Sequence, residues 1–180
     1  STGLRLGITG NRGTDGTALA LLFDGGNGGQ DTLRTAAFGS PPSGVSQLDG
    51  LVMDAGFEPG VMLWLNAWGG TLYVDRFALS PAGGGSKRYL GSSLVNGGAP
   101  ELSGGANTNG MQAAFDDGNT LGVTATEASG AATATSGLEA LVPWADLGAG
   151  GPGGTLRMMA MIVRPDGSIG NQFLPGLGAG

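Results

Sequence analysis

The chain has 180 residues, of which 39 are glycine, 40% are hydrophobic and only 12% are charged, a composition that fits neither a disordered chain nor a collagen-like rod. Its net charge of −6 argues against a nucleic-acid-binding protein, and no apolar run reaches the roughly 18 residues of a membrane span. It contains no cysteine and no histidine, which excludes disulfides, cysteine nucleophiles, histidine-based triads and ordinary zinc sites. We therefore expect one domain spanning 1–180, built from short β-strands whose turns use the glycines.

The first third of the chain is predicted to contain two strands and a possible third. Apolar residues alternate with others in 4–9 and form a buried run in 18–24, and 48–53 is a candidate short strand. The segment 39–44 contains two prolines, which donate no ladder hydrogen bond, so it cannot lie in a central strand.

The segment 60–79 (GVMLWLNAWGGTLYVDRFAL) predicts a β-hairpin that turns at Gly69-Gly70. Side chains alternate across a strand, so Leu65 shares a face with its apolar neighbours at every second position, and Trp64 shares the other. Both faces are largely apolar. The pattern predicts a central hairpin covered on both sides, inside a sandwich of two sheets.

The second half of the chain continues the pattern, with strands predicted at 86–94, 111–115, 138–142, 155–164 and 168–174. The adjacent Lys87 and Arg88 are expected to protect an exposed sheet edge. Segment 117–135 predicts a mobile excursion or a weak edge strand, and Pro143 to Gly148 a single helical turn. The predicted fold is all-β: a jelly-roll-like sandwich of two antiparallel sheets with at most one short helical turn.

Two acidic, glycine-rich loops are candidate calcium sites, because calcium binds carboxylate, amide and carbonyl oxygens. Neither loop has EF-hand spacing. The alternative is that these side chains form Asx turns with the local backbone. The candidate ligands are Asp24, Asn27 and Asp31 in the first loop and Asp116, Asp117 and Asn119 in the second.

The aromatic residues suggest a carbohydrate-binding surface, since flat rings stack on pyranose rings. Most of them are expected in the core, and Trp68 and Tyr89 are the two predicted to lie outside.

Catalysis would require a pair of carboxylates, for which Glu58, Asp75 and Glu139 are available. Any chain with 14 acidic residues offers such pairs, so the protein is expected not to be an enzyme.

Several segments resemble a group of secreted bacterial proteins whose members often end in a C-terminal surface-sorting signal. They are GLRLGITGN, ALALLFDGGNGGQDTLR, LDGLVMDAGFEPGVMLWLNAWGGTLYVDRFAL, SKRYLGS, GLEALVPWADLG and NQFLPGL. The ALVPWADLG segment is also similar to an element of β-sandwich domains related to family 9 carbohydrate-binding modules and DOMON domains. The resemblance implies a jelly-roll-like fold and an extracellular setting. It implies no activity, and the heme ligation of DOMON domains would need the histidine that this chain lacks.

Members of the secreted group carry a strand-forming segment ahead of the position of Leu4, and this chain begins without it. A sandwich lacking an edge strand exposes backbone groups that another subunit can pair with. We therefore expect a secreted, non-catalytic building block of a surface or extracellular assembly, including a filament formed by strand exchange. The alternative is a carbohydrate-binding module with calcium stabilising its loops. The expected partners are further copies of the chain and extracellular polysaccharide.

Overall fold

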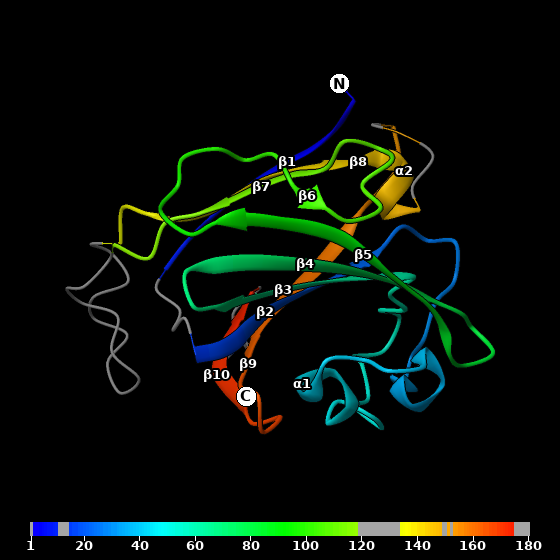
Figure 1. Ribbon diagram of the computed structural model, residues 1–180. Helices are drawn as coiled ribbons and strands as arrows, with labels where there is room; N and C mark the ends of the chain where they lie inside the picture. The colour runs from blue at the N-terminus through cyan, green and yellow to red at the C-terminus, as the bar shows by residue number, and fades with distance from the viewer. Residues whose placement is uncertain (1, 11–14, 119–133, 149–150, 152, 175–180) are drawn as a thin grey trace.

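The computed structural model describes residues 2–10, 15–118, 134–148, 151 and 153–174, which fold into two antiparallel sheets lying face to face (Figure 1). This confirms the predicted all-β sandwich. The small sheet has the order β1 (Gly3–Thr9), β8 (Gly137–Pro143), β7 (Gln112–Phe115). The large sheet has the order β10 (Ile169–Leu174), β9 (Arg157–Val163), β2 (Asp15–Asp24), β3 (Val61–Trp68), β4 (Thr71–Leu79), β5 (Gly85–Leu94), β6 (Ser103–Gly104).

The hairpin of β3 and β4 lies in the middle of the large sheet, as the sequence predicts. Trp68 pairs with Thr71 across the turn, and Gly69 and Gly70 have φ values of 56° and 81°. A two-residue hairpin turn of this kind requires positive φ at both positions, which glycine adopts without strain. The pair of glycines therefore sets the register of the two central strands.

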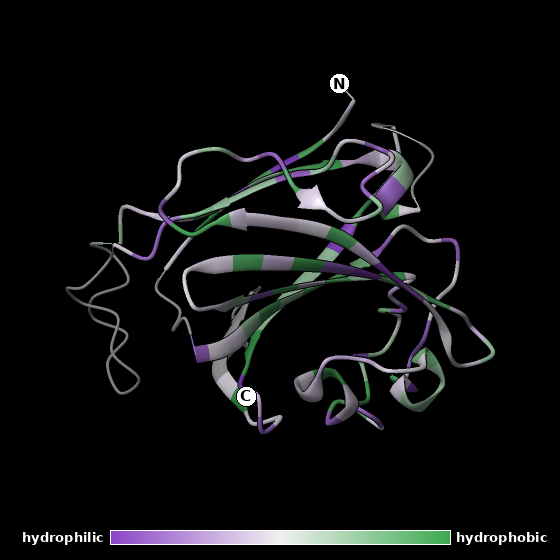
Figure 2. Ribbon diagram, in the orientation of Figure 1, coloured by the Kyte–Doolittle hydropathy of each residue, from purple (hydrophilic) through white to green (hydrophobic). Residues whose placement is uncertain are grey.

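Each face of this hairpin contributes to a different hydrophobic core. Leu65 and Val74 belong to the core between the two sheets, and Trp64 and Phe77 to a second core on the outer face of the large sheet. Figure 2 shows hydrophobic residues recurring along β4 in the middle of the large sheet. The prediction that both faces are covered is confirmed.

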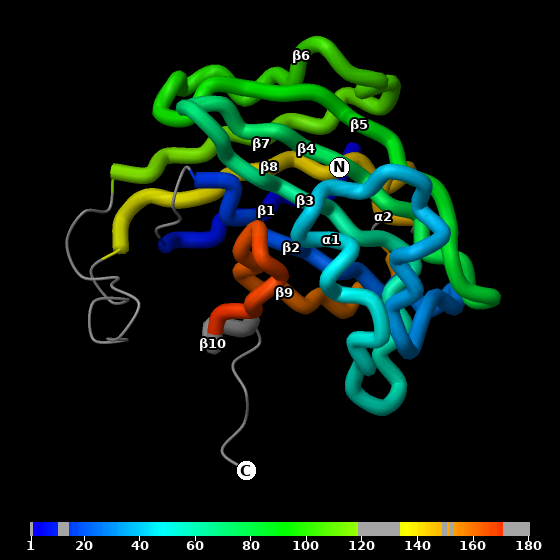
Figure 3. The backbone as a smooth tube through the Cα atoms, turned by 60° about the horizontal axis from the view of Figure 1, so that its bottom comes forward, coloured from blue at the N-terminus to red at the C-terminus, as the bar shows by residue number. Residues whose placement is uncertain are grey.

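The second core is covered by an irregular layer instead of a sheet. This layer runs between β2 and β3 and contains the 3-10 helix η1 (Thr35–Phe38) and the short helix α1 (Ser43–Ser46) (Figures 1 and 3). At Gly44 a Cβ atom would lie 2.9 Å from Cζ2 of Trp64, so α1 packs directly on the indole ring. The strand predicted at 48–53 is not formed: only the isolated bridge between Thr32 and Val52 is present there.

The predicted helical turn is present as α2 (Trp144–Leu147), with Pro143 before it and Gly148 in the left-handed conformation after it. The described residues therefore hold two short helices, α1 and α2, one more than the single turn predicted. Most of the segment predicted as an excursion, residues 119–133, lies outside the described residues.

Candidate functional site

Strand β1 is an edge strand of the small sheet. Strand β1 pairs along its length with β8, and no other described strand pairs with its second edge. The inward-facing side chains of β1, Leu4, Leu6 and Ile8, are only half-buried, although they pack against the core between the sheets. On the neighbouring β8 the inward-facing Leu138 and Val142 are buried. Among the described residues, the cover over the core is therefore incomplete beside β1.

The large sheet extends beyond this edge. At the opposite side, Oγ of Ser93 on β5 donates a hydrogen bond of 2.9 Å to the carbonyl of Ala113 on β7, which places β7 over β5. Neighbouring strands are about 4.8 Å apart in any sheet, so β8 and β1 lie over the central strands β4 and β3, and β2, β9 and β10 continue past β1 (Figure 3). The half-buried residues along this margin, here called the β1 strip, are all aliphatic: Leu4, Leu6, Ile8, Leu19, Met158 and Ile162.

A second surface lies on the outer face of the large sheet, at the hairpin end of β3–β5. Trp68 is 62% exposed and Leu94 66% exposed. Both pair with Thr71, so they share its face, which also carries the half-buried Tyr73 and Tyr89. The two aromatic residues predicted to lie outside the core, Trp68 and Tyr89, thus occur on one surface. We call Trp68, Tyr73 and Tyr89, with the neighbouring polar residues Asn66, Thr71 and Ser92, the aromatic face.

A charged cluster ties α2 to the large sheet. Asp146 is fully buried, forms ion pairs with Arg76 of β4 and Arg88 of β5, and accepts a 2.9 Å hydrogen bond from Nδ2 of Asn109. Nε of Arg76 also donates to the Asp146 carbonyl at 2.6 Å. Burial lowers the pKa of the Arg76 guanidinium, an effect that Asp146 opposes and Arg88 reinforces. The cluster clamps the end of the small sheet onto β4 and β5.

The expectation that Arg88 guards a sheet edge is therefore wrong, because its guanidinium is directed to the buried Asp146. Lys87 is directed to the opposite face of β5, where its Nζ lies 3.4 Å from Oδ1 of the buried Asp75. Neighbouring residues on a strand point to opposite faces, so Lys87 and Arg88 form ion pairs with two different carboxylates. The sequence contained no signal for the pairing of Arg88 with Asp146, because the two residues are 58 positions apart.

Burial raises the pKa of the Asp75 carboxyl, and Lys87 opposes the shift only partly. A carboxyl whose pKa is raised by folding stabilises the protein fully below its unfolded pKa of about 4, and this contribution disappears as the pH rises through the folded pKa. Asp75→Asn removes the titrating group. We therefore expect the stability of this variant, relative to wild type, to increase between pH 4 and pH 7, by about 1.4 kcal/mol for each unit separating the two pKa values.

Urea unfolding at a series of pH values measures this difference. Glu139→Gln is the matched control, because Glu139 is an exposed carboxylate on β8. A stability difference between Asp75→Asn and wild type that stays constant across this pH range would contradict the assignment.

The first acidic loop is held by donors from the protein itself. Asp24 is buried, and its two oxygens accept hydrogen bonds from the backbone N–H of Gly26 (2.8 Å) and of Glu58 (3.0 Å) and from Nη2 of Arg157 (2.5 Å). Nδ2 of Asn27 donates to the carbonyl of Gly148 at 3.0 Å, and the Asp31 side chain is exposed. The bond to Gly26 is an Asx turn, the alternative raised for this loop.

The second acidic loop contains a similar turn. Oδ1 of Asp116 accepts a hydrogen bond of 2.7 Å from the Gly118 N–H, and Oδ1 of Asp117 accepts one of 2.6 Å from Nδ2 of Asn96. Asn119 lies outside the described residues. Within the described ranges no three acidic side chains are grouped closely enough to share a metal ion. Calcium binding at either loop stays a prediction.

The carboxylates considered for catalysis are widely distributed. Asp75 lies on the outer side of the large sheet, in the register of Trp64, whereas Glu139 is exposed on the outer side of the small sheet. Both sheets separate these two groups, so they cannot act on one glycosidic bond. Glu58 is exposed in the loop before β3.

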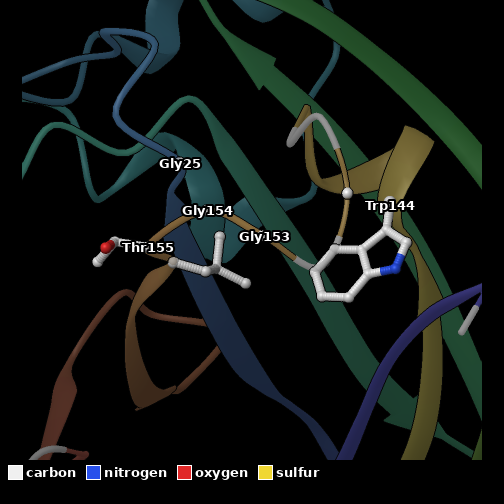
Figure 4. Close-up of a pocket in the computed structure, with 7 residues that line it drawn as sticks. Gly25, Trp144, Gly153, Gly154 and Thr155 are labelled. Carbon is white, nitrogen blue, oxygen red and sulfur yellow. The ribbon is translucent and has the colours of Figure 1, made fainter.

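A pocket of about 280 Å³ lies beside α2, with the Trp144 ring on one side (Figure 4). One hydroxyl group, from Thr155, is present, and no ionisable side chain lines it, so these residues supply no acid, base or charged ligand. The lining residues are Gly25, Trp144, Gly151, Gly153, Gly154, Thr155 and Leu156.

Comparison of the chain with protein-family models, with curated proteins and with solved structures finds no match. Function is therefore inferred from the chain's own surfaces. No helix in the described part of the chain is long and apolar enough to cross a membrane.

Proposed function

We propose that this protein is a non-catalytic structural protein, a building block that associates with further copies of itself through the open edge of β1. The observation that carries the proposal is the combination of an edge strand without a second described neighbour and the half-buried aliphatic β1 strip beside it. An exposed strand edge is a template for pairing with another chain.

The chemistry of the strip favours a β-strand as the occupant. A strand added beside β1 would pair with its backbone and lie over β2 next to β9, where its side chains would cover Leu19 and Ile162. The strip carries no charged side chain, so it suits an apolar segment of a second copy. Pairing of two β1 strands would close a dimer, whereas strand exchange repeated head to tail would build a filament.

The setting we propose is extracellular or at the cell surface. A low charged fraction with abundant glycine, serine, threonine and alanine suits a structural role outside the cell better than a cytosolic enzyme. The resemblance of the sequence to secreted bacterial proteins supports the same setting.

We expect Ile162→Lys to prevent self-association, because it places a charge where the side chains of an incoming strand would pack. Ile162 is half-buried and lies opposite Leu19, so the lysine side chain introduced in the variant could extend to solvent in the monomer. Val52→Lys is the matched control, since Val52 is 71% exposed and distant from the strip.

Sedimentation velocity over a hundredfold range of concentration, with electron microscopy of the concentrated samples, provides the measurement. Wild type and Val52→Lys should form dimers or larger species, and Ile162→Lys should remain monomeric. Wild-type protein that stays monomeric over the whole range would refute the proposed function.

A further inference from the structure

The aromatic face forms a second, independent surface, and we propose that it binds a chain of neutral pyranose sugars. It lies on the outer side of the large sheet and shares no residue with the β1 strip. Binding there would give the building block a contact with a polysaccharide matrix in addition to its contacts with other copies.

The three aromatic residues lie on a diagonal across three strands. Trp68 pairs with Thr71, and Tyr73 is two residues further along β4. Tyr73 pairs with Ser92, and Tyr89 pairs with Asp75, which is two residues beyond Tyr73. Each step is thus a diagonal neighbour, about 7–8 Å across, and the row spans about 15 Å. A ligand that contacts all three rings must be extended and several rings long.

Polar side chains alternate with the rings. Asn66 and Ser92 flank Tyr73 in the register, and Thr71 lies between Trp68 and Leu94. A pyranose presents apolar C–H groups on its faces and hydroxyl groups around its rim, so it can stack on rings and hydrogen-bond to such neighbours together. The β1 strip offers only aliphatic groups, which fit a peptide strand. The difference in chemistry assigns different occupants to the two surfaces.

The charges nearby favour a neutral ligand. Asp75 and Lys87, at the border of the aromatic face, are paired with each other at 3.4 Å. The chain as a whole carries a net charge of −6, which disfavours an acidic polysaccharide.

The surface is also organised before any ligand binds. A Cβ atom on Gly16 would lie 3.3 Å from Cε3 of Trp68, so the indole rests on the bare backbone of β2. The layer that contains α1 covers Trp64 and Phe77 but leaves the hairpin end of β3 and β4 clear (Figure 3). Rings fixed on paired strands lose little conformational freedom on binding, which favours affinity.

Native gel electrophoresis through gels containing hydroxyethylcellulose, xylan or laminarin tests the proposal, with polygalacturonate as the acidic comparison. The experiment uses the Ile162→Lys background, so that retardation by self-association does not interfere. We expect retardation by at least one neutral polysaccharide, and a loss of about tenfold or more in affinity for Trp68→Ala and Tyr73→Ala.

Two control variants distinguish ring stacking from non-specific binding through exposed apolar side chains. Leu94→Ala removes an equally exposed apolar side chain beside the face, and Val52→Ala removes one distant from it; both should retain binding. Unchanged urea midpoints would show that the variants are folded. The proposal is overturned if no neutral polysaccharide retards the protein, if only polygalacturonate does, or if Leu94→Ala weakens binding as much as Trp68→Ala. None of these results bears on self-association, which the sedimentation experiment tests separately.

Discussion

Replacing Asp146 with alanine is expected to lower the free energy of unfolding by about 3–5 kcal/mol, the usual cost of removing one partner from a buried ion pair. Arg76 and Arg88 lie directly opposite each other on β4 and β5, and Asp146 is the carboxylate that both of them contact. Without it, two cations would face each other across neighbouring strands, with side chains only 15% and 33% exposed to the solvent that could screen them. The clamp between α2 and the large sheet would be lost with it.

Urea unfolding followed by fluorescence measures this loss. Glu139→Ala is the control, because Glu139 is an exposed acidic residue on β8, the strand that leads into α2, and its replacement should change stability by less than about 1 kcal/mol. Asp146→Asn should fall between the two, since an amide keeps the shape and part of the hydrogen bonding but loses the charge. Equal stabilities for Asp146→Ala and Glu139→Ala would show that the cluster does not stabilise the fold.

Trp64→Ala is expected to cost about 3–5 kcal/mol, because it empties the centre of the outer core. The indole is only 2% exposed and supports α1 through the close contact with Gly44. Its removal would leave a cavity beneath the irregular layer, which is held by turn hydrogen bonds and one isolated β-bridge instead of a continuous strand ladder.

Trp68→Ala is the matched comparison for this prediction. Trp68 lies on the same strand and the same face as Trp64, four residues further along, but is 62% exposed. Its replacement should change the thermal and urea midpoints little. If Trp64→Ala and Trp68→Ala lowered the free energy of unfolding by similar amounts, the result would contradict a layer that covers Trp64 and leaves Trp68 exposed.

Local pattern was sufficient to predict most strands. The alternation in β3 and β4 and the Gly69-Gly70 turn are contained in twenty consecutive residues, and strand periodicity depends on nothing more distant. The same holds for α2, where a proline and a glycine bound a single turn. Trp68 is exposed because the hairpin end of β3 extends beyond the layer that covers the centre of the sheet, whereas Tyr89, in the middle of β5, is half-buried.

Features that depend on contacts between distant segments were not predicted. The partner of Arg88 is Asp146, 58 residues away, and nothing in either local sequence links them. The irregular layer over Trp64 was partly mistaken for a strand, because apolar residues at 48–53 serve equally in a strand or in turns that pack on a sheet. Tyr73 was assigned to the core because periodicity gives the face of a residue but not how far a covering layer reaches.

Hydrogen–deuterium exchange at low and high protein concentration tests most directly whether the β1 edge is the site of association. We expect exchange of the β1 amides to slow as concentration rises, while exchange at the Gly69-Gly70 turn stays constant. In Ile162→Lys the β1 amides should exchange at one rate at all concentrations. Exchange in wild-type β1 that does not depend on concentration would contradict self-association through this edge.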